Sequence, residues 1–227
     1  ADLSLLAFQD ISIGGVTSTG GTISLLAGGQ LSGAGELDVS GSTWTLGGDF
    51  EKSNGTLTIS ETNLTLTNNI TLTSDEALSF VTLNLNYKTL TLGSSTSDLT
   101  VKSPLNDTGF ISSTTEGIST GGADLILKSF LIIDGEGSVT STSGEVSFLA
   151  GGRLSGSGEL DLSGSTWVLG GDFEKRPVVG SQLSGTLTIS QTDFKLADNS
   201  TLTSDEALNF VNLNLNDFTL TLGSSTS

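Results

Sequence analysis

The sequence VTSTGGTISLLAGGQLSGAGELDVSGSTWTLGGDFEK at residues 16–52 returns as VTSTSGEVSFLAGGRLSGSGELDLSGSTWVLGGDFEK at residues 139–175, with 29 of 37 positions identical. A second block, residues 55–97, returns as residues 185–227. The offset grows from 123 to 130 residues between the two blocks because the second copy carries a seven-residue insertion near residues 176–182 (RPVVGSQ). Long internal repeats of this kind are typical of proteins built from stacked units.

A finer pattern lies inside each copy, where apolar residues alternate with Thr, Ser, Asn or Asp. A period of two predicts half-buried strands, and no window shows a convincing helical stripe. Gly, Ser, Asn and Asp between the segments are turn formers. Residues 76–80 (EALSF) are interpreted as a turn or a short irregular segment. The predicted strands include TISL at 22, ELDV at 36, TWTL at 43, TLTI at 56, NLTL at 63, ITLT at 70, TLNL at 82, TLTL at 89, DLTV at 98 and DLIL at 124.

The spacing of these strands predicts how they stack. TISL, TWTL, NLTL and TLNL begin 21, 20 and 19 residues apart. We therefore predict an all-β fold, a single-stranded parallel β-helix (β-solenoid) of about 20 residues per coil and about eleven coils. At about 4.8 Å per coil the rod would be about 50 Å long. Residues 1–122 form the first long repeat and residues 123–227 the second, truncated one, continuous in one solenoid. The insertion is expected as a side loop between strands.

The alternation also predicts which large side chains point inward. Trp44 shares a strand face with Leu46, and Trp167 with Leu169, so both indoles are expected in the core. Acidic residues fall mostly at outward or turn positions, where they keep a long β surface soluble; examples are Asp38, Asp49, Glu51 and Asp75. Four phenylalanines are expected to point inward as well: Phe50, Phe80, Phe173 and Phe210.

The composition of the 227 residues excludes several classes of function. Cysteine, histidine and methionine are absent, so disulfides, the usual zinc, haem and iron–sulfur sites, and catalysis by Ser-His-Asp or Cys-His are excluded. A formal net charge of −17 argues against nucleic acid and anionic membrane surfaces as partners. No apolar run approaches the roughly 20 residues that span a bilayer, so we expect no membrane insertion in this segment. We expect the chain to be a piece of a longer protein.

Two repeated acidic pairs are the candidates for a metal site. Asp75-Glu76 and Asp205-Glu206 occur in the same heptapeptide, LTSDEAL. Carboxylate oxygens on a turn are hard donors of the kind that Ca²⁺ prefers. The glycine–aspartate nonapeptide of calcium β-rolls is missing around them, so a solvated turn is the alternative. The hexapeptide GGDFEK at residues 47–52 is interpreted as a coil corner, with Glu51 and Lys52 on opposite faces of a strand.

The sequence offers weak candidates for a carboxylate-based enzyme and for an ice-binding surface, and each has a simpler interpretation. Some carbohydrate-cleaving β-helices work with clustered acids and a basic partner. Here Arg153 aligns with Gln30, Arg176 lies in the insertion and the acids are spread out, so we predict no catalytic residue, no cofactor and no enzyme. Ice binding needs unbroken rows of threonine on one flat face, whereas plain β-propensity explains an outward threonine equally well. The Thr-x-Thr pairs fall on several strands: Thr56/Thr58, Thr71/Thr73, Thr89/Thr91 and Thr219/Thr221.

Tandem long repeats of coils such as STSGEVSFLAGGRLSGSGELDLSG and TLTLGSSTS resemble the repetitive β-helix region of very large bacterial secreted or surface proteins. The filamentous-haemagglutinin-like and autotransporter-like adhesins are the class it resembles. The resemblance implies an extracellular, non-catalytic stalk or fibre that displays or carries binding tips. It is carried by composition and coil period over the whole chain.

These observations predict a structural or adhesive repeat segment of a large bacterial protein at the cell surface. Its expected partners are the surfaces or glycans of host or partner cells, bound weakly at each unit and many times over. Two alternatives stay open. One is a solenoid that binds glycan or ice through outward Thr and Asn rows, and the other is a subunit that assembles into filaments.

Overall fold

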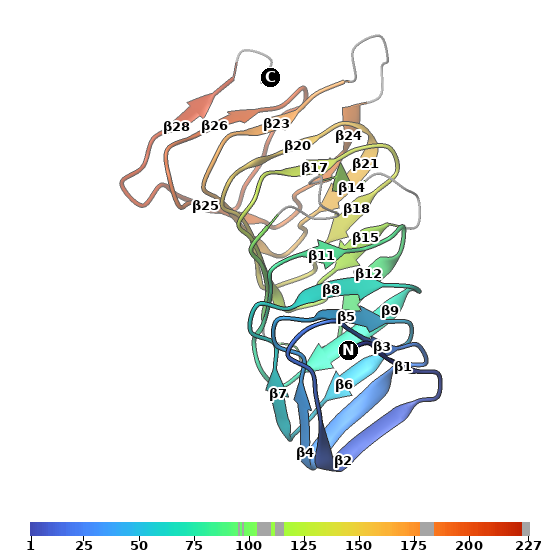
Figure 1. Cartoon of the computed structure of the whole chain (residues 1–227). Helices are drawn as coiled ribbons and strands as arrows, with labels where there is room; N and C mark the ends of the chain where they lie inside the picture. Colours follow the sequence, from blue (N-terminus) through green and yellow to red (C-terminus); the bar gives the residue numbers. More distant parts are fainter. Residues whose placement is uncertain (95, 97, 104–109, 112–115, 178–183, 224–227) are drawn as a thin grey trace.

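A computed structural model describes residues 1–94, 96, 98–103, 110–111, 116–177 and 184–223. Over these residues the chain forms a parallel β-solenoid of about ten turns with about 21 residues per turn. The N-terminal turns (blue) lie at one end of the stack and the C-terminal turns (red) at the other (Figure 1). The predicted fold class is therefore confirmed. None of the described residues belongs to a helix that is long and apolar enough to cross a membrane.

The described strands pair in parallel into sheets that occupy three faces, which we number in the order the chain visits them. Face 1 holds one sheet of five strands and, further along, one of six. It contains β1 (Leu3–Leu5), β3 (Thr22–Leu25), β5 (Thr43–Leu46), β8 (Asn63–Leu66) and β11 (Leu83–Asn84), then β14 (Phe110–Ile111), β17 (Leu131–Ile133), β20 (Gly152–Leu154), β23 (Phe173–Lys175), β26 (Ser200–Thr203) and β28 (Leu220–Leu222).

After each face-1 strand the chain passes through face 2 and then through face 3. Face 2 contains β2 (Gln9–Thr17), β4 (Gly29–Asp38), β6 (Phe50–Lys52), β9 (Ile70–Ser74), β12 (Thr89–Leu92), β15 (Gly117–Ser119), β18 (Ser138–Thr140), β21 (Gly156–Asp161) and β24 (Ser184–Thr188). β2 and β4 are long and run on into face 3, where the end of β4 pairs with β7. Face 3 contains β7 (Thr56–Thr58), β10 (Leu78–Phe80), β13 (Asp98–Val101), β16 (Asp124–Leu127), β19 (Glu145–Phe148), β22 (Thr166–Leu169), β25 (Asp193–Leu196) and β27 (Leu213–Asn214).

The turns are slightly longer than predicted because a few of them carry extra residues. Most paired residues are 19 to 22 positions apart, as in Trp44 with Leu64. Leu90, however, pairs with Ile118, which is 28 positions on, and Trp167 pairs with Phe194, which is 27 on. The second of these turns contains the insertion, which lies between β23 and β24 as predicted; its residues 178–182 lie outside the described residues. The interpretation of residues 76–80 as a turn is wrong for Leu78–Phe80, which form β10.

One continuous apolar column runs along the axis, as the alternation predicts. Trp44 and Trp167 are fully buried, and each meets the phenylalanine of the following strand edge-on at 4.8 Å, Phe50 in one copy and Phe173 in the other. Phe80 is also buried, whereas Phe210 is only partly buried against Trp167 and Phe194. The column opens at both ends, where large apolar side chains are exposed: Leu3, Leu6, Phe8 and Ile13 at one end, and Val211, Leu213, Leu215 and Leu222 at the other.

The two copies of the long repeat do not lie on the same faces. Trp44 is on β5 of face 1, whereas its equivalent Trp167 is on β22 of face 3. In the same way the FEK strand is β6 on face 2 in the first copy and β23 on face 1 in the second. From β5 to β22 the chain takes 17 strand steps at three per turn, which is five turns and two thirds. Equivalent motifs therefore point about a third of a turn apart.

Candidate functional site

A buried lysine is the most unusual side chain of the described interior. Lys52 ends β6, a strand whose side chains alternate in, out and in. Phe50 and Lys52 are 1% and 2% exposed, whereas Glu51 points into solvent, so the prediction that Glu51 and Lys52 lie on opposite faces is confirmed. The strand parity with Phe50 was the signal that Lys52 points inward. Lysine is nevertheless rarely buried without a partner, so strand parity alone does not predict a buried Lys52.

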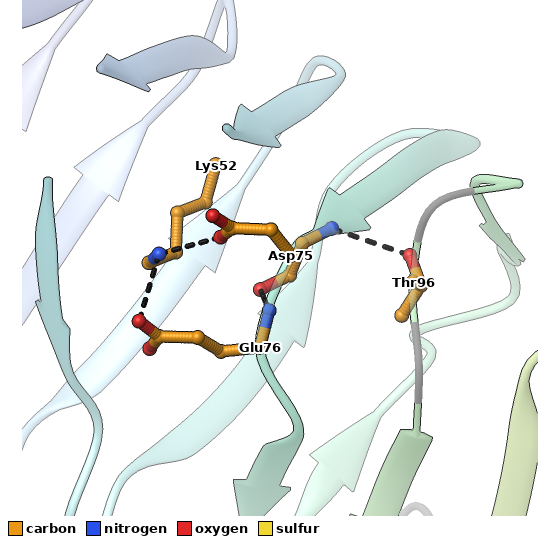
Figure 2. Close-up of polar contacts among 5 residues, drawn as sticks. Lys52, Asp75, Glu76 and Thr96 are labelled. Carbon is orange, nitrogen blue, oxygen red and sulfur yellow. Dashed lines mark hydrogen bonds and ion pairs between the residues drawn. The ribbon is translucent and has the colours of Figure 1, made fainter. Parts of the chain in front are cut away.

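The partners of Lys52 come from the next turn. Lys52 pairs in register with Ser74, the last residue of β9, so Asp75 and Glu76 follow at the adjoining corner. The Nζ of Lys52 donates to Oδ1 of Asp75 at 2.5 Å and contacts Oε1 of Glu76 at 3.0 Å (Figure 2). The two carboxylate side chains are 43% and 58% exposed. The ammonium group is therefore inside, and its counter-charges stand at the rim.

Backbone contacts hold the corner that carries these carboxylates (Figure 2). The amide of Glu76 donates to Oγ of Ser74 at 3.1 Å, and the amide of Ser74 donates to Oγ1 of Thr96 at 3.3 Å. Thr96 is itself buried and donates to the carbonyl of Leu72 at 3.1 Å. One hydrogen bond within the corner and others between turns thus hold the segment that carries both acidic residues.

Electrostatics favour the charged form of this lysine. Burial by itself lowers the pKa of Lys52, because removing an ammonium group from water is costly. The hydrogen bonds and charges of Asp75 and Glu76 outweigh that effect, and the pKa of Lys52 is raised above its ordinary value. The lysine therefore stays protonated at neutral pH and is unsuited to act as a base.

The second copy repeats the arrangement on a different face. Lys175 on β23 is 2% exposed, and its Nζ contacts Oδ1 of Asp205 at 2.6 Å and Oε1 of Glu206 at 2.7 Å. Its pKa is shifted by the same causes in the same direction. We call Lys52 with Asp75 and Glu76, and Lys175 with Asp205 and Glu206, the lysine clamps. Each clamp ties one turn to the next.

The clamps occupy the residues that the sequence suggested for Ca²⁺. In both copies one oxygen of each carboxylate contacts the lysine ammonium, which supplies the positive charge that a cation would bring. A Ca²⁺ ion at the same oxygens would have to displace a buried ammonium group and leave it unpaired. Within the described parts of the chain, no three or more His, Cys, Asp or Glu side chains gather where they could hold a metal ion.

The Gly-Gly-Asp part of the GGDFEK motif forms a corner between faces, as the sequence predicts, and Phe50–Lys52 form β6. Asp49 follows the glycine pair, and its Oδ1 accepts a hydrogen bond from the amide of Thr71 on the next turn at 2.6 Å. Asp172 accepts the equivalent bond from the amide of Thr201 at 2.7 Å. The acidic side chain at this corner therefore satisfies a backbone donor between turns.

The two arginines lie on or beside face-1 strands, and the Thr-x-Thr pairs are spread over several strands, as predicted. Arg153 lies on β20, and Arg176 follows β23 and contacts Glu174 at 3.1 Å. Three of the four threonine pairs fall on separate strands, β7, β9 and β12, and the fourth spans the start of β28. Between them only Thr71 and Thr91 are in register on neighbouring strands, so these pairs make no continuous array.

Comparison with protein-family models, with curated proteins and with solved structures finds no match to this chain.

Proposed function

We propose that this chain is a rigid, non-catalytic spacer, a stalk segment of a large extracellular bacterial surface protein. The observation that carries the proposal is how the two copies differ. Between residues 16–52 and 139–175, each inward replacement exchanges one apolar residue for another: Ile23 for Val146, Leu25 for Phe148 and Val39 for Leu162. Outward replacements change the chemistry, as when Glu145 stands for Thr22. The shared property of the copies is thus the packed rod.

The contacts between turns support a stiff rod. Parallel hydrogen-bonded strands join each described turn to the next, and the apolar column is continuous from Ile11 to Leu202. The two lysine clamps add a buried ionic contact at the same place in each copy. A spacer needs these axial contacts and needs no convergent site. Adhesion, if a stalk of this kind has it, is then weak at each unit and gains strength from repetition.

A distance measurement between two spin labels tests the rigidity. The chain has no cysteine, so Thr19→Cys and Ser190→Cys provide two unique labelling positions at exposed corners. The corners are between seven and eight turns apart, so we expect a single narrow distribution with an axial component of about 37 Å. A broad distribution would contradict a rigid spacer, and hydrolysis of a polysaccharide by the purified chain would contradict a non-catalytic one.

A further inference from the structure

An array of uncharged polar side chains covers face 1 in the first copy. The outward residues of β3, β5, β8 and β11 stack in two columns because these strands pair in register. Neighbouring rows are about 4.8 Å apart along the rod. In this array the threonines are mixed with Ser and Asn, and the strands are the four whose spacing predicted their stacking. We call it the hydroxyl ladder; it consists of Thr22, Thr43, Asn63 and Thr82 in one column and Ser24, Thr45, Thr65 and Asn84 in the other.

Most of the hydroxyl groups in the ladder are available to a ligand. The ladder residues are partly exposed. Only Thr82 uses its hydroxyl within the described protein, donating to Oδ1 of Asn63 at 2.8 Å, and Asn84 accepts from the amide of Asn86 at 3.0 Å. The remaining hydroxyls form no hydrogen bond to another described residue; they belong to Thr22, Ser24, Thr43, Thr45 and Thr65.

The backbone beneath the ladder is firmly held. The inward residues of the same strands, Ile23, Trp44, Leu64 and Leu83, are at most 1% exposed. Trp44 is wedged between Phe50 and Phe80. A flat parallel sheet on such a core presents its hydroxyl groups at fixed spacing, so that little ordering is needed when a ligand binds.

The second copy provides a comparison on the same kind of backbone. The strands equivalent to the ladder strands lie on face 3, and five of the eight positions there are changed: Glu145, Val168, Asp193, Lys195 and Asn212 replace Thr22, Thr45, Asn63, Thr65 and Thr82. Three of these side chains are charged, and Val168 is apolar and 3% exposed. Oγ of Ser147 donates to Glu145 at 2.9 Å, and Lys195 lies 3.8 Å from Glu145. The free, uncharged array is therefore specific to the first copy.

We propose that the hydroxyl ladder binds an uncharged polysaccharide laid across the flat face, in addition to the spacer role. Hydroxyl and amide groups are the donors and acceptors that match the hydroxyl groups of sugars. Covering a charged side chain with a neutral ligand is costly, because the charge loses water and gains no partner. The ladder contains no charged side chain, so a neutral ligand can bind it without this cost. The net charge of −17 opposes acidic polysaccharides. Each sugar contributes a weak contact, and the repeated rows add up.

Exchange of the two arrays tests the proposal with the chain as its own control. The variant T22E/T45V/N63D/T65K gives four ladder positions the residues of the second copy, which the same strand type already carries in this chain. The reciprocal variant E145T/V168T/D193N/K195T gives the equivalent strands of face 3 the ladder residues at these four positions. Binding is measured on insoluble cellulose and chitin and by affinity electrophoresis in mannan. We expect the first variant to lose about tenfold or more in affinity for the neutral polymer that binds, and the second to bind about twice as much per molecule.

The controls separate the ladder from other causes. Melting temperatures of both variants within a few degrees of the wild type show that the fold is kept. Equal binding by the wild type and the ladder variant, or binding to none of the three neutral polymers, would overturn the proposal. Binding to alginate alone, which is an acidic polysaccharide, would contradict the proposal that the ligand is uncharged. Uptake into growing ice that follows the ladder, without polysaccharide binding, would assign the array to ice instead.

Discussion

Lys52 shows how a charged residue becomes part of a narrow apolar column. Its alkyl stem fills the space that strand parity gives to an inward residue, while its ammonium group reaches Asp75 and Glu76 at the rim. A buried charge without partners would be strongly destabilising, and the partners stay half-exposed, so only one of the three groups is fully desolvated. The same arrangement recurs at Lys175 on a different face of the rod.

We expect the clamps to make the stability of the protein fall at alkaline pH. Both lysine pKa values are raised above their ordinary value of 10.5, so the stabilisation is fully present below about pH 10.5 and is lost as the pH rises through the folded-state pKa. We expect the variant K52M/K175M to lose about 1–3 kcal/mol at neutral pH. Its midpoint of urea unfolding should then fall less steeply than that of the wild type above pH 10.5.

The difference between the two proteins isolates the clamps, because every other titrating group is common to both. Parallel pH profiles would contradict the assigned role. So would a K52M/K175M variant as stable as the wild type at neutral pH.

At the scale of strands and corners, one glycine position fixes how the chain turns from face 1 to face 2. Gly28 has φ +78°, and a Cβ there would lie 2.1 Å from the carbonyl oxygen of Asp49 on the next turn. Gly151, its equivalent, has φ +79° and would meet the carbonyl oxygen of Asp172 at 2.0 Å. The backbone of the next turn packs too closely for any side chain, so the requirement is the same wherever the corner recurs.

We therefore expect Gly28→Ala to destabilise the solenoid by about 2 kcal/mol or more, from the left-handed backbone and the backbone clash together. Gly20→Ala is the matched control, because a Cβ at Gly20 meets nothing within 4 Å. The free energy of unfolding of Gly20→Ala, measured by urea unfolding, should stay within about 0.5 kcal/mol of the wild-type value. Equal effects of the two changes would show that the close contact at the corner does not limit stability.

For the whole molecule, the main feature is that the second copy of the long repeat is rotated about the axis relative to the first. A long repeat of 123 residues takes five turns and two thirds, so a motif on face 1 in one copy appears on face 3 in the next. The hydroxyl ladder and its charged counterpart accordingly face different directions. A rod of such repeats presents its surfaces around the axis, which suits a spacer more than a one-sided adhesive strip.

Insertion of a second copy of residues 16–138 after residue 138 tests this geometry. Because residues 16 and 139 are equivalent, both new junctions keep a sequence that the chain already has. The rod should lengthen by about 27 Å, and all residues downstream should move round by one face. Electron microscopy with a label on an exposed residue of the second copy measures both quantities. A lengthened rod with the label on its original face would contradict the rotation.

The alternation of side chains was enough to predict the solenoid, the inward tryptophans and the stacking period. Each strand must bury one face, and a period of two shows which one. Coil length was underestimated because a few turns, such as the one from Leu90 to Ile118, carry extra residues that no pattern marks. Leu78–Phe80 was misassigned because a short strand beside a turn has little alternation of its own.

The local sequence determined which residues of this protein point inward and where its corners fall, because those depend on neighbours along the strand. The tertiary structure alone decided that Lys52 meets Asp75 and Glu76 and that the second copy is turned by one face. Those facts depend on which residues of successive turns lie side by side. Register between turns is set by the exact residue count of every coil, and a difference of one or two residues changes the pairing.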